Sequence, residues 1–199
     1  MAEEGLHSLE TELVQLRDEC AELSSWDVDY VNVVYSNHDD FLNRYLRSAR
    51  YADTTQPHNH RLSLKLALAV LDGKNPLEYA VHELFGLKKH KMNWLKLDED
   101  FILAGIQNIH GHLGANGSRN PTIVALERVY KLSNSGHNHG SEILRGAWRA
   151  GTSTYLKLGY NKGPSSWSNS HIITYRNGAR QLIYTIDGKW HKDSKVILK

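Results

Sequence analysis

Histidine, asparagine and aspartate side chains gather in three short clusters of this sequence, and these residue types can bind metal and transfer protons. The clusters are Asn37-His38-Asp39, His110-Gly111-His112 and His137-Asn138-His139. Imidazole nitrogens suit zinc, and amide or carboxylate oxygens suit magnesium and manganese. A histidine can also act as a general acid, because its charge changes near neutral pH. The three clusters therefore predict a metal-centred site.

Each cluster also has an ordinary structural interpretation. Asn37 or Asp39 could cap a helix, since both residue types favour that position. His112 could be a loop histidine held by a hydrogen bond. His137 and His139 would share one side of an extended backbone, but a His-x-His pair can also arise by chance among 12 histidines. The three clusters together, in this order, indicate a metal site more specifically than any one of them alone.

The elements expected around the clusters favour an α/β fold. β-branched and aromatic residues predict strands at 28–34 and 101–109, directly before the first two clusters. Because each cluster follows or adjoins a strand, the three clusters can project from one edge of a sheet. Leucine spacing predicts an amphipathic helix at 7–23. The segment 39–86 is expected to be helical, with its 62–71 helix buried all round, and 88–96 is expected to be a basic connection that contains Met92.

The rest of the sequence predicts another helix and then a β-rich C-terminal third. Asn120-Pro121 has the composition of a helix start, with the helix at 122–132. Asn177-Gly178 favours a hairpin with a type I′ turn. We treat 1–199 as one domain, with a β-rich part at 140–190. Its expected strands are 143–150, 152–158, 171–175 and 181–186.

Composition limits the classes of protein that the chain can belong to. The 199 residues suffice for an ordinary core, and no apolar run approaches the ~20 residues of a membrane span. The N-terminus lacks the apolar region of a secretory signal, and the single cysteine, Cys20, can form no internal disulfide. A cytoplasmic protein with a packed thiol is expected.

Charge is unevenly distributed along the chain, although the net charge is only +2. Residues 1–40 carry eleven acidic side chains and one basic one, whereas residues from 140 onward carry ten basic and three acidic ones. A basic face of this kind fits DNA as a partner, and a solvated lysine-rich surface is the alternative. The candidate nucleic-acid-binding residues are Lys162, Arg176 and Arg180.

Several motifs in order resemble the C-terminal half of the calcineurin-like metallophosphoesterases. Within that superfamily, the chain is most similar to tailed-phage DNA-transfer proteins of the pre-early DNase type, over about residues 6 to 190. The matching motifs are Asn37-His38-Asp39, Asn75-Pro76-Leu77-Glu78-Tyr79, His110-Gly111-His112-Leu113-Gly114, Gly136-His137-Asn138-His139, Gly151-Thr152-Ser153 and Tyr160-Asn161-Lys162-Gly163-Pro164.

The resemblance implies part of a metallophosphoesterase-like sandwich with two divalent ions, Mn, Mg or Zn. In the superfamily, residues matching Asn37, His110 and His137 bind the second metal. The residue matching His139 binds the first metal. The resemblance makes His38 the proton donor to the leaving group, with Asp39 orienting its ring.

The chain departs from the superfamily where the first metal should be bound. It has no Asp-x-His and no Gly-Asp motif, and Ser36 replaces the usual glycine before Asn37. Residues 131–135 are more polar than the expected strand before Gly136. We therefore expect the C-terminal portion of a phage DNase that needs a separate N-terminal half chain, with a second copy of the chain as a further partner. The alternatives are a non-catalytic DNA-binding or assembly protein and a remnant with no independent role.

Overall fold

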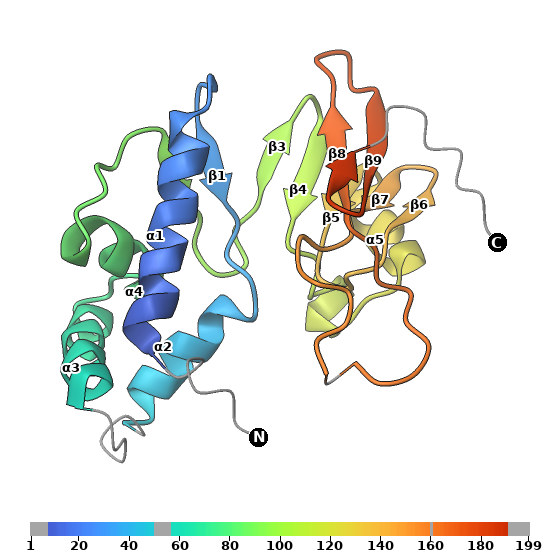
Figure 1. Ribbon diagram of the computed structural model, residues 1–199. Coiled ribbons are helices and arrows are strands. Elements are labelled where there is room, and N and C mark those ends of the chain that lie inside the picture. The colour runs from blue at the N-terminus through green and yellow to red at the C-terminus, as the bar shows by residue number, and fades with distance from the viewer. Residues whose placement is uncertain (1–7, 50–56, 160, 191–199) are drawn as a thin grey trace. The chain divides into compact units, whose positions relative to one another are not determined.

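The computed structural model describes residues 8–49, 57–159 and 161–190, which form two compact units, Met1–Leu97 and Asp98–Lys199 (Figure 1). Helices and several small sheets give the mixed α/β class that the sequence predicts. The grouping of both units into one domain, and the metallophosphoesterase-like sandwich, stay predictions. None of the helices in the described ranges is long and apolar enough to cross a membrane.

The first unit is mainly helical, as expected for 39–86. Asn75 caps α4 by accepting hydrogen bonds from the backbone of Leu77 and Glu78, and Pro76 opens the helix, which confirms that predicted start. The helix continues without a break into a π-helical turn, η2. The elements are α1 (Leu9–Ser25), β1 (Val31–Val33), α2 (Asp39–Arg47), α3 (Pro57–Leu71), α4 (Pro76–Tyr79), η2 (Ala80–Leu84) and β2 (Met92–Trp94).

Apolar side chains from four helices form the core of this unit. Leu13, Leu46, Leu66, Val70 and Ala80 are each less than 5% exposed and pack together. A neighbouring cluster of Cys20, Val81 and Met92 lies against the parallel pair β1–β2. Burial raises the pKa of the Cys20 thiol, helped by Glu19. The expectation of a packed cysteine is thereby confirmed.

Two expectations for this unit are wrong. The helix α3 was expected to be buried all round, but Leu64, Leu68 and Leu71 are 45%, 63% and 78% exposed. Only one face of α3 packs on its neighbours, so leucine content alone overstated its burial. The segment around Met92 was expected to be a connection, yet it forms β2 beside β1.

The second unit is organised by a five-stranded sheet in the order β3-β4-β5-β7-β6. β4, β5 and β7 run parallel, and the edge strands β3 and β6 are antiparallel to their neighbours. α5 (Ile123–Tyr130) follows η3 (Ala115–Gly117) and connects to β5. The strands are β3 (Phe101–Leu103), β4 (Ile106–Ile109), β5 (Ser133–Ser135), β6 (Glu142–Leu144) and β7 (Ala147–Arg149).

Two segments expected to be single strands are hairpins. The segment 101–109 turns at Ala104-Gly105, where both residues have positive φ, 49° and 76°. The segment 143–150 turns at Arg145-Gly146, and φ of Arg145 is 40°. Residues with positive φ at a short turn reverse the chain. The sequence prediction missed the first turn because it treated an isolated glycine as part of a strand.

A second sheet in this unit pairs β8 (Ser170–Thr174), β9 (Arg180–Ile186) and β10 (Lys189–Trp190). The predicted hairpin around Asn177-Gly178 is confirmed, but its turn is not type I′. Only Gly178 has positive φ, 79°, and the Tyr175 carbonyl accepts from the Gly178 N–H. A turn followed by a left-handed glycine is the usual three-residue alternative. The strand expected at 152–158 is reduced to one bridge, between Thr152 and Asn169.

Candidate metal centre

Two of the predicted metal ligands meet at the carboxyl ends of neighbouring parallel strands. β4 and β5 pair in register up to Ile109 and Ser135, so the next residues of both strands leave the sheet at one edge. The Gly136 N–H donates to the His110 carbonyl over 3.0 Å. This backbone bond places His137 Nδ1 3.2 Å from His110 Nε2, and the two ring centroids are 5.0 Å apart.

Asn120 fixes the protonation pattern of this histidine pair. Its side-chain oxygen lies 2.7 Å from His137 Nε2, and an amide oxygen only accepts. His137 Nε2 therefore carries the proton in the neutral ring, and Nδ1 accepts the hydrogen bond from His110 Nε2. An ion bound between these two nitrogens would replace that proton. A carbonyl oxygen on the far nitrogen is the usual outer partner of a metal-binding histidine.

His112 adds a third imidazole to the same place. Its ring centroid is 5.2 Å from that of His110 and 6.0 Å from that of His137. Its Nε2 lies 3.3 Å from the carboxylate of Asp98. The sequence interpretation of His112 as a hydrogen-bonded loop histidine fits this contact, but His112 also belongs to the cluster.

Gly111 allows this arrangement because the backbone approaches β5 closely. Its φ is +93°, and a Cβ atom there would lie 2.8 Å from the Cβ of Ser135. A side chain at this position would strain the backbone and collide with β5, the strand that leads to His137. The glycine between His110 and His112 is therefore required by the geometry.

His139 lies on the same loop as His137 but contacts a different side chain. Both histidines have left-handed backbone conformations, with φ of 68° and 59°. The loop is therefore a tight turn, as the glycine before it suggests, and not the extended backbone that would place both side chains on one side. The ring of His139 meets Trp167 edge to face, with 4.3 Å between centroids.

From the sequence alone, Asn120 was predicted to have a different role. It was expected to begin the helix at 122–132, but Thr122 caps α5 by accepting from the Ala125 N–H, and Lys131, with φ of 60°, ends it. Asn120 itself has φ of 51° and turns its side chain toward His137. Spacing from Pro121 suggested a cap, and no local signal revealed a partner 17 residues away.

Asn37-His38-Asp39 lies in the first unit, where a reciprocal cap opens α2. The Ser36 N–H donates to Asp39 Oδ2 over 2.7 Å, and the Asp39 N–H donates to Ser36 Oγ over 3.1 Å. This is the capping box seen at helix starts, with Asp in place of Glu. His38 stacks on Phe41 at 5.2 Å. The catalytic roles of His38 and Asp39, and the ligand role of Asn37, stay predictions.

The candidate nucleic-acid-binding residues differ in what their side chains contact. Arg180 donates from Nη1 to Ser133 O and Asn134 Oδ1, and from Nη2 to Gly146 O. Burial lowers the pKa of its guanidinium. The side chain therefore joins the two sheets of its unit. Lys162 and Arg176 are exposed, and their contact with DNA stays a prediction.

The histidine pair has the spacing for one metal ion but not a complete ligand set. Two nitrogens bound at about 2.0–2.1 Å to one tetrahedral ion lie roughly 3.3 Å apart, close to the observed 3.2 Å. Across the described ranges, no group of three or more His, Cys, Asp or Glu side chains is placed to hold an ion. His110 and His137 fit a metal in part, so other ligands would have to complete the site.

The mixed α/β chain, with its histidine cluster at strand ends, is similar to one curated protein, Protein A1 of Escherichia phage T5. The two are 40% identical over 175 residues, which cover 82% of this chain. The chain spans only 30% of the length of that relative. The similarity supports a bacteriophage protein. No family matches the chain. No solved structure matches it.

Proposed function

We propose that this chain is the C-terminal portion of a phage metal-dependent phosphodiesterase that acts on DNA. The observation that carries the proposal is the His110–His137 pair, held by Asn120 at the ends of two parallel strands. The resemblance of these motifs to the metallophosphoesterases, and the similarity to a phage protein, support the same conclusion.

In this proposal each residue has one role. His110 and His137 hold an ion through ring nitrogens, and Asn120 keeps the lone pair of His137 Nδ1 directed at it. Asn37 supplies a neutral oxygen, and His38 donates a proton to the leaving oxygen. A bound pair of ions would polarise the phosphodiester and supply an acidic water.

The chain alone should be inactive. Two neighbouring ions need a shared carboxylate, and the sequence has neither the Asp-x-His nor the Gly-Asp motif that would provide one. His139 by itself would be a weak ligand for the first ion. A second polypeptide carrying those motifs is therefore the proposed partner, in the cytoplasm of the host.

Calorimetry with Mn²⁺ and Zn²⁺ tests the metal centre directly. Unmodified protein should bind weakly, and less well as pH falls and the imidazoles protonate. His137→Ala should abolish binding, and Asn120→Ala should weaken it about 10-fold or more by releasing the ring orientation. His171→Ala, an exposed histidine of the same unit, is the matched control. Equal binding by His137→Ala and the unmodified protein would rule the site out.

Activity measurements test whether the chain needs a separate N-terminal half chain. The purified chain in Mn²⁺ should hydrolyse no phosphodiester above background. Adding a chain with Asp-x-His and Gly-Asp should restore hydrolysis, and His38→Ala should remove it again, since a general acid contributes typically 10²–10⁴-fold. Strong hydrolysis by the chain alone, lost in His137→Ala, would contradict the requirement for a partner.

A non-catalytic DNA-binding or assembly role is the second candidate. The excess of ten basic over three acidic residues after 140, with Lys162 and Arg176 exposed, favours it. DNA affinity should then fall steeply with salt, and replacing both residues with alanine should flatten that dependence. Arg180 is unsuitable for this test because its guanidinium holds the sheets together. If DNA affinity did not depend on salt, the basic residues would be an ordinary solvated surface and not a DNA-binding site.

A further inference from the structure

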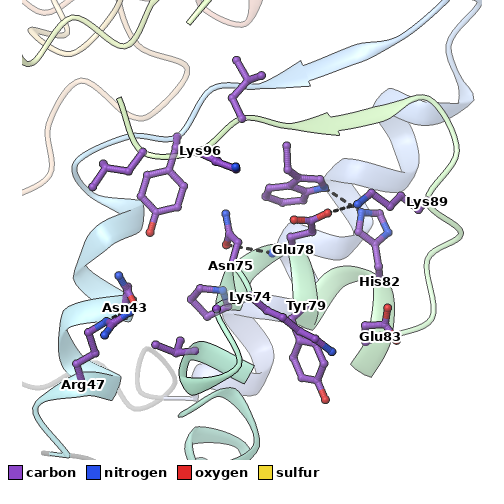
Figure 2. Close-up of a pocket in the computed structure, with 17 residues that line it drawn as sticks. Asn43, Arg47, Lys74, Asn75, Glu78, Tyr79, His82, Glu83, Lys89 and Lys96 are labelled. Atoms are coloured by element: carbon purple, nitrogen blue, oxygen red, sulfur yellow. Dashed lines mark hydrogen bonds and ion pairs between the residues drawn. The ribbon is translucent and has the colours of Figure 1, made fainter. Parts of the chain in front are cut away.

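The first unit contains a cavity that the proposed function does not use. Its volume is about 490 Å³, and the lining residues come from α2, the α4–η2 helix, β2 and the segments beside them (Figure 2). Cavities of about 300–1,000 Å³ accommodate small organic ligands. All of its lining residues belong to the first unit.

The charged side chains around the cavity favour an anion. Four basic residues line it, against two acidic ones. Glu78 is paired with Lys89, so these two charges balance each other and three basic residues remain against one acidic one. Lys74 lies over the ring of Tyr79, with 4.9 Å from its nitrogen to the ring centroid. The basic residues are Arg47, Lys74, Lys89 and Lys96, and the acidic ones are Glu78 and Glu83.

Two side chains in the cavity wall carry hydrogen-bond donors that have no acceptor among the described residues. The side-chain oxygen of Asn75 accepts the hydrogen bonds that cap α4. Figure 2 shows its amide nitrogen directed into the cavity. Tyr35 is only 8% exposed, and within the described ranges its hydroxyl has no hydrogen-bond partner. Burial, with Asp40 and Asp39 nearby, raises the pKa of Tyr35 to about 12. The hydroxyl therefore stays protonated and able to donate.

An aromatic wall of the cavity is fixed in orientation. The Trp94 indole N–H donates to His82 Nε2 over 2.9 Å, so His82 Nδ1 carries the proton and donates to the Leu87 carbonyl at 2.7 Å. His82 lies in the π-helical turn η2, a geometry that is rare and frequent at functional sites. Trp94 and Tyr35 thus present rigid aromatic surface beside the cationic residues.

We propose that this cavity binds a nucleoside monophosphate, either free or as the terminal nucleotide of a DNA strand. Arg47, Lys74 and Lys96 would contact the phosphate, since guanidinium and ammonium groups bind phosphate oxygens. The aromatic wall would contact the base, because bases stack on aromatic side chains. Asn75 and Tyr35 would donate to acceptors on the base edge or the sugar.

Calorimetry in EDTA with deoxyadenosine and thymidine 5′-monophosphates tests the proposal without involving a metal centre. Each monophosphate should bind with a sub-millimolar Kd. Deoxyadenosine alone and inorganic phosphate alone should each bind at least 10-fold more weakly. Phosphate that binds as well as the monophosphate would overturn the assignment to a nucleotide, and so would the absence of any binding.

Variants connect the binding to this cavity. Arg47→Gln combined with Lys74→Gln should weaken monophosphate binding 10-fold or more, and Tyr35→Phe should weaken it about 3-fold or more while preserving the ring. Arg61→Gln combined with Lys65→Gln removes the same two charges at exposed positions of α3 outside the cavity, and should have no effect. Circular dichroism checks that each variant is folded. Unchanged affinity in the folded double variant would overturn the proposal.

Competition identifies the source of the nucleotide. A 5′-phosphorylated oligonucleotide that displaces the monophosphate indicates a DNA end, and one that does not indicates a free nucleotide. Both outcomes support the proposed ligand class. The same sequence closed into a circle has no terminal nucleotide. If the circle competes as well as the linear strand, the cavity does not select a mononucleotide and the proposal fails.

Discussion

Different interactions stabilise the interior of each of the two units. The first unit packs apolar side chains from α1, α2, α3 and α4 into one cluster around Leu66. In the second unit, the central strand β5 has the sequence Ser-Asn-Ser, and all three residues are buried. Asn134 donates to Asn108 and Thr174, and Arg180 donates to the strand from the second sheet.

The hydrogen-bonded centre of the second unit bears on the histidine cluster. Asn134 and Arg180 join β5 to its neighbours through side-chain hydrogen bonds, and such a network holds the strand ends in place. The loops after β4 and β5 then hold His110 and His137 within 3.2 Å of each other. In the first unit, charged and polar side chains instead line a cavity beside the apolar core.

The largest expected effect is on the apolar core. Leu66 is completely buried, so Leu66→Ala should destabilise the first unit by about 2–5 kcal/mol. Leu68, on the same helix, is 63% exposed, and Leu68→Ala should change stability by less than about 0.5 kcal/mol. Hydrogen exchange followed by mass spectrometry measures each unit separately. Equal protection in the two variants would contradict the assigned core.

Removing the partly buried guanidinium of Arg180 should destabilise the second unit, but through polar groups. Arg180→Met keeps much of the side-chain volume and leaves Ser133 O, Asn134 Oδ1 and Gly146 O without this donor. Buried groups left unsatisfied cost about 1–3 kcal/mol. Exchange in β5 and β9 should accelerate, while the first unit is unchanged.

The exposed Arg176 provides the control for that measurement. Arg176→Met removes the same charge from the turn before β9 and should alter exchange little, by less than about 0.5 kcal/mol. If both variants behaved alike, Arg180 would be a surface residue like its neighbour and would return to the candidate DNA-binding surface.

The sequence predicted the first unit better than the second because apolar periodicity marks helices. The helix predicted at 7–23 is α1, Leu9–Ser25. The helix predicted at 62–71 ends at the right residue but begins earlier, at Pro57. β5 was judged too polar for a strand, since its hydrogen-bond partners lie as far as 40 residues away. The contact between Asn120 and His137 was not predicted for the same reason, since the two residues are 17 positions apart. The His-x-His clusters were visible because their ligand chemistry is local, whereas the partner that orients them is not.

The close approach at Gly111 gives a smaller and more local effect. Gly111→Ala combines a φ of +93° with a Cβ 2.8 Å from Ser135, so it should cost about 1–3 kcal/mol. Gly105 has a similar φ of +76° but open space around it. Gly105→Ala should therefore cost only the backbone strain, about 1 kcal/mol. The difference in urea midpoint between the variants measures the contact between the two histidine-bearing segments. No difference would mean that they do not approach each other.

The smallest expected effect is a pH dependence confined to the second unit. Glu127 of α5 pairs with Arg145 and accepts from the Gly146 N–H, so it ties the helix to the β6–β7 turn. The hydrogen bond from Arg145 lowers the pKa of Glu127 below its usual 4.5. A lowered pKa in the folded state means that the contribution is complete above pH 4.5 and is lost as pH falls through the lowered value.

Arg145 is exposed, although Glu127 is largely covered, so salt should weaken the contribution. Exchange in α5 and β7 should accelerate between pH 4.5 and lower values, and Glu127→Gln should remove that dependence. The apolar cluster of the first unit contains no carboxyl group and should not share this dependence. A parallel loss of protection in both units over this range would show that acid acts on the chain as a whole. The contrast between an apolar and a polar unit would then not extend to their response to pH.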